Sequence, residues 1–454
     1  MVHKKTNLTF TSGLRKSLRL VLLVIVGMTL GTSLRSLANS KFDPDQETYA
    51  QLALFADVLT RVQDGYVEPV ETNLLVADAM NGLLQSLDPH SRYVLPVDYK
   101  AQIKRDKREY GGLGIEVTME GGYIKVGYAN PGAPAARAGI KAGDQITHVE
   151  GKSIKDKNLS DAVKKMRGLA GDPITVTVKS PGRPARDVVV IREVIQGRVV
   201  RHRIYEGVGY IYLETFKNSH AARDVSEAID LLKAEHGGTL PGLVLDLRGN
   251  GGGFLTQSVD VAGLFLNGGE VVSVRGRQKD DNSRFHAKQG EKLPGVPLVI
   301  LVNDTTASAS EIVAGALQDR GRAIIVGVPS FGKGSVQSVI PLAGGDKGEL
   351  HLTTARYFTP SGRSIQGLGI TPDVWVEPYK DDGKEHSRYS ESELQHSLDV
   401  IIRETEGKTN TKAQPKPKFA PDDWPDDKDF QLEEAVKLLK SPDYKSQLRN
   451  FFNQ

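Results

Sequence analysis

The feature that most constrains the fold is an ordered run of elements between Leu298 and Pro341. Residues Leu298–Val302 are apolar and rich in β-branched side chains, which predicts a buried strand. A Ser-rich segment that can begin a helix follows, and we expect the helix over Glu311–Asp319 and a strand over Ala323–Val326. This order places Ser308 at a strand-to-helix turn.

A hydroxyl at such a turn has a special environment. Backbone N–H groups there lack partners within the helix and the helix dipole is positive, which suits an oxyanion. Ser308 could therefore be a nucleophile. Ser308-x-x-Glu311 is also a capping box, so a purely structural role as a helix cap stays open.

A single lysine, Lys333, lies between two glycines in the segment Ser330–Gln337. Glycine neighbours add no side-chain bulk, so the amine could reach a partner and be kept from water. Loss of solvation lowers the pKa of a lysine from about 10.4 toward neutrality, and a neutral lysine can deprotonate a serine. Gln337, expected on the same strand face as Lys333 and Ser335, could hold the amine with its side-chain carbonyl.

These segments resemble the C-terminal processing peptidases, a family of serine proteases with a Ser–Lys dyad. The family's Ser-Ala-Ser-Glu segment matches Ser308–Glu311, and its Phe-Gly-Lys-Gly-x-x-Gln segment matches Phe331–Gln337. The resemblance implies that Ser308 is the nucleophile, that Lys333 is the base and that Gln337 orients the lysine.

Other interpretations of the same residues are weaker. The run Gly327–Lys333 imitates a phosphate-binding loop, but Gly334 stands where a magnesium-ligating Ser or Thr is required. The residues that follow predict a strand, whereas a phosphate-binding loop needs a helix there. Ser310 and Ser335 are the alternative nucleophiles, and the motif match favours Ser308.

A second Gly-rich loop, Asp246–Gly253, ends another predicted buried strand. Backbone N–H groups in such a loop are free to bind an anion, and the resemblance implies that the final glycine donates to the oxyanion. We therefore pair the N–H of Gly253 with that of Ala309 as the expected oxyanion hole. Gly252 stays open as the donor, and so does a turn with no catalytic role.

The stretch 98–181 resembles a PDZ domain. Tyr110–Ile115 is a Gly-rich loop that feeds a strand, Ala138–Gly151 carries the turn-and-strand signature of that fold, and Ala162–Arg167 is its expected groove helix. Successive N–H groups of such a loop can converge on a peptide C-terminal carboxylate. The expected substrate-binding residues are Gly112, Leu113, Gly114 and Ile115.

Arg167 is the residue for which we expect a regulatory role. It matches an arginine that in some family members helps couple the PDZ domain to the protease domain. The alternative is a solvated arginine at a helix end, favoured by the helix dipole. The linker Ser180–Pro184, rich in Gly and Pro, would permit a rigid-body swing between the two domains.

The N-terminus has the order of an export signal. Basic residues precede an apolar run over Leu20–Leu30, and Ser36-Leu-Ala38 is a small-x-small cleavage site. The run is short for a bilayer span of about 20 residues, so we predict export to the periplasm. An uncleaved membrane anchor is the alternative.

Composition excludes several classes of function. Removing residues 1–38 removes six Lys or Arg and no Asp or Glu, which changes the formal net charge from +3 to −3. The mature chain therefore has no basic excess that would recruit nucleic acid. The chain has no cysteine, and its ten histidines show no metal-binding spacing. We expect no metal and no cofactor.

These observations predict an α/β multidomain protein. In the core we expect strands at Val188–Ile191, Val208–Leu213 and Leu243–Leu247, and a helix over Ala221–Lys233. The expected parts are a signal peptide (1–38), a helical segment (39–97), a β-rich PDZ domain with helices (98–181), a mixed α/β, ClpP/crotonase-like serine protease core (182–380), a charged and Pro-rich linker (381–425) and a helical tail (426–454).

The predicted function is that of an exported serine endopeptidase that binds polypeptide C-termini through its PDZ domain and cleaves through an acyl-enzyme. The resemblance covers Tyr49–Glu377. Polypeptides with accessible C-termini are the expected substrates, a homo-oligomer is expected, and an adaptor protein is compatible with this reading. A catalytically silent PDZ scaffold is the rival.

In the turn Ser86–Tyr93, we expect His90 to have a packing role.

Overall fold

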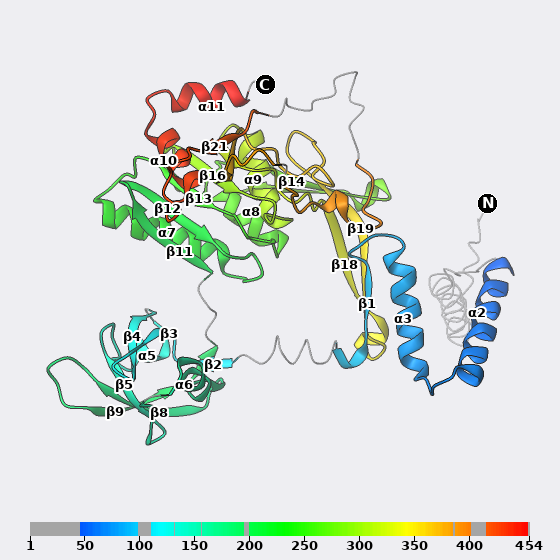
Figure 1. Ribbon diagram of the computed structural model, residues 1–454, viewed down its shortest axis with the longest axis horizontal. Helices are drawn as coiled ribbons and strands as arrows, with labels where there is room; N and C mark the ends of the chain where they lie inside the picture. The colour runs from blue at the N-terminus through cyan, green and yellow to red at the C-terminus, as the bar shows by residue number, and fades with distance from the viewer. Residues whose placement is uncertain are drawn as a thin grey trace, which may run out of the picture. The chain divides into compact units, whose positions relative to one another are not determined.

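The structure is a computed structural model that describes residues 46–98, 110–130, 132–155, 157–194, 199–384, 386–400 and 415–452 (Figure 1). The chain divides into two compact units, residues 1–76 and 77–454. The predicted signal peptide, its cleavage site and the alternative anchor lie outside the described residues. No helix in the described ranges is long and apolar enough to cross a bilayer.

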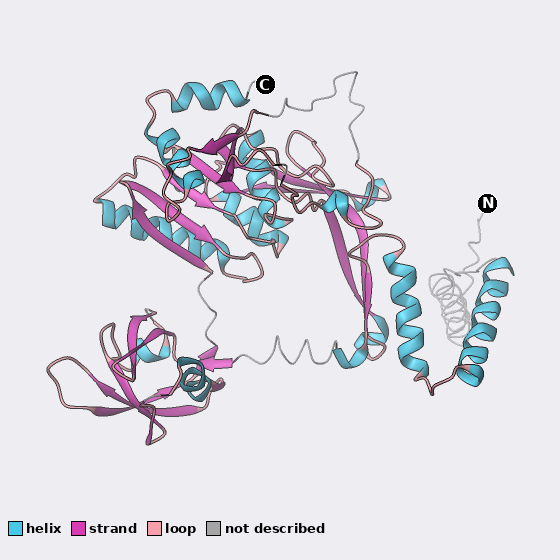
Figure 2. Cartoon of the chain, in the orientation of Figure 1, coloured by secondary structure: helices cyan, strands magenta, loops and turns pink. Residues whose placement is uncertain are grey.

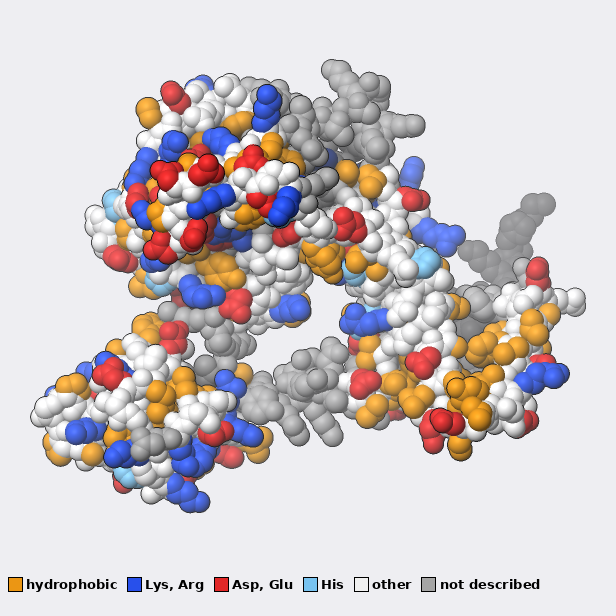
Figure 3. Space-filling model, viewed as in Figure 1, with side chains coloured by type: hydrophobic (Ala, Val, Ile, Leu, Met, Phe, Trp, Pro, Cys, Tyr) orange, Lys and Arg blue, Asp and Glu red, His pale blue; other side chains and the backbone are white. Residues whose placement is uncertain are grey.

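The predicted helical segment contains α2 (Gln46–Gly65) and α3 (Thr72–Gln85). None of the residues of α2 is buried, so its apolar stripe packs into no core formed by the described residues. Figure 3 shows hydrophobic side chains gathered over α2 and α3. Those of α2 that are large and exposed are Tyr49, Leu52, Leu54, Phe55 and Val58.

A six-stranded antiparallel sheet forms the PDZ part. Its order is β3-β4-β5-β8-β9, with β6 paired to β5, and β3 is an edge strand. Strands β2, β7 and β10 form a separate small sheet, and α5 and α6 are the helices. The bounds are β2 Tyr110–Gly112, β3 Ile115–Glu120, β4 Tyr123–Ala129, α5 Pro134–Arg137, β5 Gln145–Val149, β6 Lys152–Ser153, α6 Leu159–Met166, β7 Gly168–Leu169, β8 Pro173–Lys179, β9 Arg186–Ile191 and β10 Glu193–Val194.

One predicted boundary is wrong. We expected Ser180–Pro184 to be a linker and Val188–Ile191 to open the protease core. Strand β9 instead pairs antiparallel with β8 across its whole length, so the Pro- and Gly-rich segment is the turn of a hairpin. The buried side chains of Val188 and Val190 belong to the PDZ core. The PDZ part therefore extends at least to the end of β9.

The protease core is built on a seven-stranded sheet of order β11-β12-β13-β16-β17-β20-β21. All neighbours from β12 onward run parallel, and β11 is antiparallel at one edge. The strands predicted at Val208–Leu213 and Leu298–Val302 have those bounds. The bounds are β11 Val200–Tyr205, β12 Val208–Leu213, β13 Leu243–Asp246, β16 Leu298–Val302, β17 Ile324–Gly327, β20 Val374–Lys380 and β21 Lys418–Ala420.

Helices cover both faces of this sheet (Figure 2). One face packs against α7 (Ala221–His236), α8 (Leu255–Gly263) and α9 (Ala309–Asp319). The other packs against α10 (Phe430–Lys440), with α11 (Tyr444–Phe452) following it. Continuously apolar strands such as β16 are expected in a parallel sheet that is buried on both faces.

A second, antiparallel sheet carries the strand that follows the lysine. Its order is β1-β19-β14-β15, with β18 also paired to β19. Strand β1 comes from the segment that we expected to be helical, and it pairs with β19 over its three residues. The bounds are β1 Arg92–Val94, β14 Gly269–Gly276, β15 Ser283–Ala287, β18 Ser335–Pro341 and β19 Glu349–Phe358.

The predicted linker 381–425 is in part folded onto the core. Strand β21 extends the central sheet, and Glu391, in a short 3₁₀ helix over Glu391–Glu393, is fully buried. The sequence did not predict this folded part, because the segment is charged and Pro-rich, a composition typical of linkers. The predicted amphipathic helix that follows is confirmed as α10, and its apolar face docks on the chain's own sheet.

Candidate active site

Ser308 lies where strand β16 turns into helix α9. Its φ of 57° is positive, which is unusual for a residue other than glycine, so surrounding contacts must hold it there. Three hydrogen bonds do so: the Thr306 hydroxyl donates to the Leu247 carbonyl (2.9 Å), the Ala307 N–H to the Asn250 carbonyl (3.1 Å) and the Ser308 N–H to Glu311 Oε2 (2.7 Å). Ser308 remains partly exposed at the helix N-terminus.

The alternative nucleophiles are engaged elsewhere. Ser310 is fully buried, and its hydroxyl donates to the Asn250 carbonyl (2.9 Å). Ser335 is 2% exposed, and its Oγ accepts from the Gln337 amide (2.9 Å). Of the three serines, only Ser308 is partly exposed. The geometry therefore favours Ser308 over the other two.

The lysine loop, Phe331–Gly334, contacts this turn directly. The Phe331 N–H donates to the Thr306 carbonyl (3.0 Å). Close packing requires glycine at position 334, because a Cβ there would lie 2.3 Å from the backbone nitrogen of Gln366. The segment after the lysine is the strand β18, so the helix that a phosphate-binding loop needs is absent at that point. The structure thus argues against a nucleotide site here.

Glu311 joins the serine turn to the lysine loop. Its Oε2 accepts from the backbone N–H groups of Ser308 (2.7 Å) and Lys333 (2.9 Å), and its Oε1 accepts from Gly332 N (2.6 Å) and the Ser330 hydroxyl (2.6 Å). The side chain is fully buried. Burial raises the pKa of its carboxyl to about 7, although the four hydrogen bonds act in the opposite direction. From the sequence, Glu311 was predicted only as part of a helix cap.

Burial lowers the pKa of the Lys333 amine, as expected for a lysine base. The Glu391 carboxylate opposes this effect more than any other charge, followed by Asp88, while Arg92 adds to the lowering. The turn Ser86–Tyr93 and the segment after β20 thus reach the lysine in space. Neither was predicted to do so.

His90 and Gln366 hold the Glu391 carboxylate. His90 Nε2 lies 2.9 Å from both carboxylate oxygens, and the Gln366 amide donates to Oε1 (3.1 Å). Gln366 also accepts the N–H of Gly334 (3.1 Å), the residue next to Lys333. His90 thus forms a polar pair near the lysine, which the packing role expected for it did not include. No sequence signal marked Glu391.

Gln337 lies beside the same network. Its amide nitrogen donates to Ser335 Oγ (2.9 Å) and Thr353 Oγ1 (3.1 Å). Ser335 and Gln337 therefore do face one another, as expected. Lys333, however, precedes β18, and a bulge separates Val336 from Gln337, so the three residues do not share one regular strand face.

The Gly-rich loop after β13 packs against the serine turn. A Cβ on Gly252 would lie 2.7 Å from the Ala307 carbonyl oxygen and 2.9 Å from the Ala309 nitrogen. The Gly252 N–H already donates to Asn250 Oδ1 (2.9 Å). Among the hydrogen bonds of the described residues, none uses the N–H of Gly253 or Ala309 as its donor. This favours Gly253 over Gly252 as the partner of Ala309.

The Gly-rich loop between β2 and β3 of the PDZ part also has backbone N–H groups without a partner among the described residues. Leu113 is buried in the PDZ core, and its carbonyl accepts from Ala135 N (2.9 Å), which fixes the loop. Within the described hydrogen bonds outside helices and strands, neither Leu113 nor Gly114 donates its N–H. Gly114 has a φ of 72°, a backbone conformation that favours glycine.

Arg167 follows α6 as its C-cap residue, and its side chain is exposed. A different arginine contacts the end of this helix: the buried Arg192 donates from Nε to the Met166 carbonyl (2.9 Å). Its guanidinium occupies the space that a Cβ on Gly168 would need. Sequence reasoning missed Arg192, because it lies beyond the predicted end of the PDZ domain.

Comparisons with known proteins show the family to which the chain belongs. The sequence pattern of peptidase family S41 matches residues 207–376, and that of the PDZ domain matches residues 125–180. The carboxy-terminal-processing protease of Bartonella bacilliformis is 44% identical over 436 residues, which are 93% of this chain and 96% of the relative. The carboxy-terminal processing protease CtpA of Bacillus subtilis is 31% identical over 78% of this chain and 74% of the relative.

Among solved structures, the photosystem II D1 C-terminal processing protease is similar, with 31% identity, a TM-score of 0.43, and coverage of 72% of this chain and 93% of that one. The identity to the Bartonella protein extends over nearly the whole of both chains. The chain therefore belongs to peptidase family S41, with a PDZ domain, and is a serine-type peptidase.

Proposed function

We propose that the protein is an exported serine endopeptidase that captures polypeptides by their C-termini and cleaves them with a Ser308–Lys333 dyad. The observation that carries this proposal is the Glu311 carboxylate, which binds the backbone of both residues at once. A single buried group thereby holds the backbones of Ser308 and Lys333 close together. Burial lowers the pKa of Lys333, which favours the neutral amine that the reaction needs.

In the proposed reaction, Ser308 and Lys333 act together. The neutral Lys333 amine takes the proton of the Ser308 hydroxyl while Oγ forms a bond to the scissile carbonyl carbon. The N–H groups of Gly253 and Ala309 stabilise the resulting oxyanion. The lysine ammonium then gives its proton to the leaving amine as the C–N bond breaks, which leaves an acyl-enzyme. A water molecule, deprotonated by the same lysine, releases the acid and restores the serine.

Two features support a C-terminal capture site on the PDZ domain. Strand β3 is an edge strand, so a peptide backbone can pair with it. In the loop at its start, Leu113 and Gly114 offer unused N–H groups to the terminal carboxylate. In this proposal a bound peptide shifts the PDZ domain toward a state that admits substrate, and Arg167 couples the two domains. Export rests on the N-terminal sequence alone.

The homo-oligomer is also part of the proposal. The uncovered apolar side chains of α2, among them Leu52 and Phe55, are the surface that supports it. An adaptor protein is compatible with the PDZ domain, which could bind its C-terminus as well as that of a substrate.

The decisive experiment measures hydrolysis of a polypeptide by wild-type protein, Ser308→Ala and Lys333→Ala. Each variant should lose roughly a thousandfold or more in kcat/KM, and the double variant should be no worse, because the two residues act as one unit. Ser310→Ala is the matched control and should keep its turnover. Activity should rise with pH as Lys333 loses its proton.

A silent scaffold would bind C-terminal peptides without hydrolysing them, and its Ser308 would not react with a fluorophosphonate probe. That result in the wild-type chain would overturn the proposed activity. Loss of turnover in Ser310→Ala with retention in Ser308→Ala would move the nucleophile instead.

A further inference from the structure

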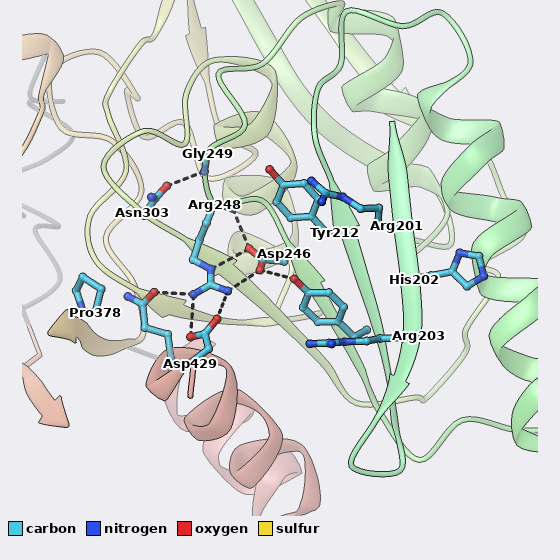
Figure 4. A pocket seen from close by; sticks show the side chains of 12 residues that line it. Arg201, His202, Arg203, Tyr212, Asp246, Arg248, Gly249, Asn303, Pro378 and Asp429 are labelled. Carbon is cyan, nitrogen blue, oxygen red and sulfur yellow. Dashed lines mark hydrogen bonds and ion pairs between the residues drawn. The ribbon is translucent and has the colours of Figure 1, made fainter. Parts of the chain in front are cut away.

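A cavity of about 720 Å³ lies on the face of the central sheet that α10 covers. Figure 4 looks into it and shows side chains from β11, β12, the end of β13 and the start of α10. None of the proposed catalytic residues lines it. The cavity is therefore distinct from the candidate active site.

Its inner end holds an ion-pair cluster of one arginine and two carboxylates. The Arg248 guanidinium lies between two carboxylates, 2.6 Å from Asp246 Oδ2 and 2.6 Å from Asp429 Oδ2, and it also donates to Gln431 Oε1 (2.9 Å). Its charge is thus fully engaged within the chain. This arginine binds the start of α10, and few of its N–H groups are left to bind a ligand.

Its outer end carries unpaired positive charge. The Arg201 guanidinium carbon lies 4.7 Å from the centre of the Tyr212 ring, and that of Arg203 lies 5.2 Å from the Tyr210 ring. In the described part of the chain, neither arginine forms an ion pair with a carboxylate, and both are exposed. Stacking on an aromatic face holds a guanidinium in place and leaves its N–H edge free to donate.

Both arginines point to one side of strand β11, while His202 between them points away, as Figure 4 shows. This follows from the alternation of side chains along a strand. Strand β11 is also the edge of the seven-stranded sheet, so no described strand pairs with its outer side. An open edge can bind an extended peptide through backbone hydrogen bonds.

We propose that β11 binds an extended acidic segment of a polypeptide, with two acidic side chains two residues apart facing Arg201 and Arg203. The spacing fits because alternate residues of an added strand repeat every ~6.6 Å, the same interval that separates the two arginines along β11. The two guanidinium groups without a carboxylate partner in the described ranges favour an acidic occupant. That this segment belongs to a substrate rests on the proposed function.

The test measures binding directly, with the full-length Ser308→Ala protein so that no peptide is cleaved. A fluorescent peptide of sequence Val-Glu-Val-Glu-Val, acetylated at one end and amidated at the other, is compared with its Val-Lys-Val-Lys-Val counterpart by fluorescence polarisation. The amide removes the terminal carboxylate that the PDZ loop would bind. The acidic peptide should bind, more weakly as salt is added, and the lysine peptide should not.

Replacing both arginines (Arg201→Ala with Arg203→Ala) should weaken binding of the acidic peptide by roughly tenfold or more. Arg223→Ala is the matched control, because Arg223 is an exposed arginine of the same domain on helix α7, and it should change nothing. A melting temperature for each variant excludes unfolding as the cause of a loss.

Unchanged binding in the double variant, or equal binding of the lysine peptide, would overturn the proposal. Absence of peptide binding together with a changed oligomeric state of the double variant would assign this edge to a second copy of the chain, and would overturn it too. The proposed activity is tested separately, by fluorophosphonate labelling of Ser308 in the wild-type chain. Labelling without peptide binding removes the acidic-segment site only, and the reverse removes the peptidase mechanism only.

Discussion

Two buried glutamates contact the lysine loop, and they have different effects. Glu311 uses both oxygens to accept backbone N–H groups and a hydroxyl, so its effect is on position. Glu391 makes its hydrogen bonds to His90 and Gln366, and it acts on Lys333 through its charge. A buried carboxylate near a lysine favours the ammonium form, which opposes the effect of burial.

Glu391→Gln should therefore change the pH dependence of the reaction. Removing the negative charge leaves burial less opposed, so the pKa of Lys333 falls further and the neutral amine exists at lower pH. The acidic limb of the profile of kcat/KM against pH should move to lower pH. Glutamine keeps the size of the side chain and one hydrogen-bond acceptor, which limits damage to the fold.

Glu393→Gln is the control for this prediction, because Glu393 is exposed and lies two residues along the same 3₁₀ helix. Its pH profile should match that of the wild type. A Glu391→Gln protein that is slower at every pH, with the limb in its original place, would show that the carboxylate has only a structural role.

At the residue scale, the sequence predicted the site residues that lie in short local motifs. Ser308 and Lys333 stand in short segments of fixed spacing, and the structure brings those segments into contact. Glu391 could not be predicted, because it lies 58 residues beyond the lysine in a charged stretch and its position depends on how the chain returns after β20. His90 was discounted because nothing near it in sequence suggested a partner, and its partner is 301 residues away.

At the scale of elements, the site depends on two turns that press against each other. The loop after β13 and the turn before α9 meet at Gly252, where no side chain has room. The turns are held by the parallel pairing of β13 with β16, which brings the ends of both strands to one edge. Ligand sites at the carboxyl ends of parallel strands are the general rule for open α/β sheets.

Gly252→Ala should impair catalysis more than stability. The new Cβ would lie 2.9 Å from the Cβ of Ser308 and 2.7 Å from the Ala307 carbonyl oxygen, and the backbone there has a φ of 93°. The serine turn must move to accommodate it, and small displacements of a nucleophile cost roughly a hundredfold in rate. Steady-state kinetics and a thermal melt of the same sample measure both effects.

Gly251→Ala is a strict comparison for this variant. Gly251 is the preceding residue in the same loop, and nothing lies within 4 Å of the Cβ that alanine would add. It should retain nearly full activity. Equal losses in the two variants would mean that the loop, and not its contact with the serine turn, limits the rate.

Elements were predicted well where burial on both faces makes a strand apolar throughout, as in β16, and less well where composition misleads. The Pro- and Gly-rich stretch 180–184 has the composition of a linker, but the strands on either side of it pair as a hairpin. Composition alone cannot distinguish these cases, because a tight turn and a linker need the same residues. Strand β21 was missed because it is only three residues long.

At the scale of the whole molecule, the chain covers some of its apolar surfaces and leaves others uncovered. The tail helix α10 buries Leu432, Ala435 and Val436 against the central sheet, so the C-terminal tail is part of the core. Helix α2, in the other compact unit, buries none of its residues. Contiguous exposed apolar side chains of this kind indicate a surface that another molecule covers.

We expect that other molecule to be a second copy of the chain, since α2 presents Leu52 and Phe55 three residues apart on one helix face. Replacing both with glutamate should dissociate the oligomer, because it would place charges in an apolar contact where they lose their solvation.

Gln51→Glu adds a charge beside this stripe at another exposed position of α2 and serves as the comparison. Light scattering of the protein without residues 1–38 measures the mass of each variant. If wild type and the double glutamate variant are both monomers, α2 does not mediate self-association, and its apolar face is left for a different partner. If the double variant keeps the mass of a wild-type oligomer, the copies associate through another surface.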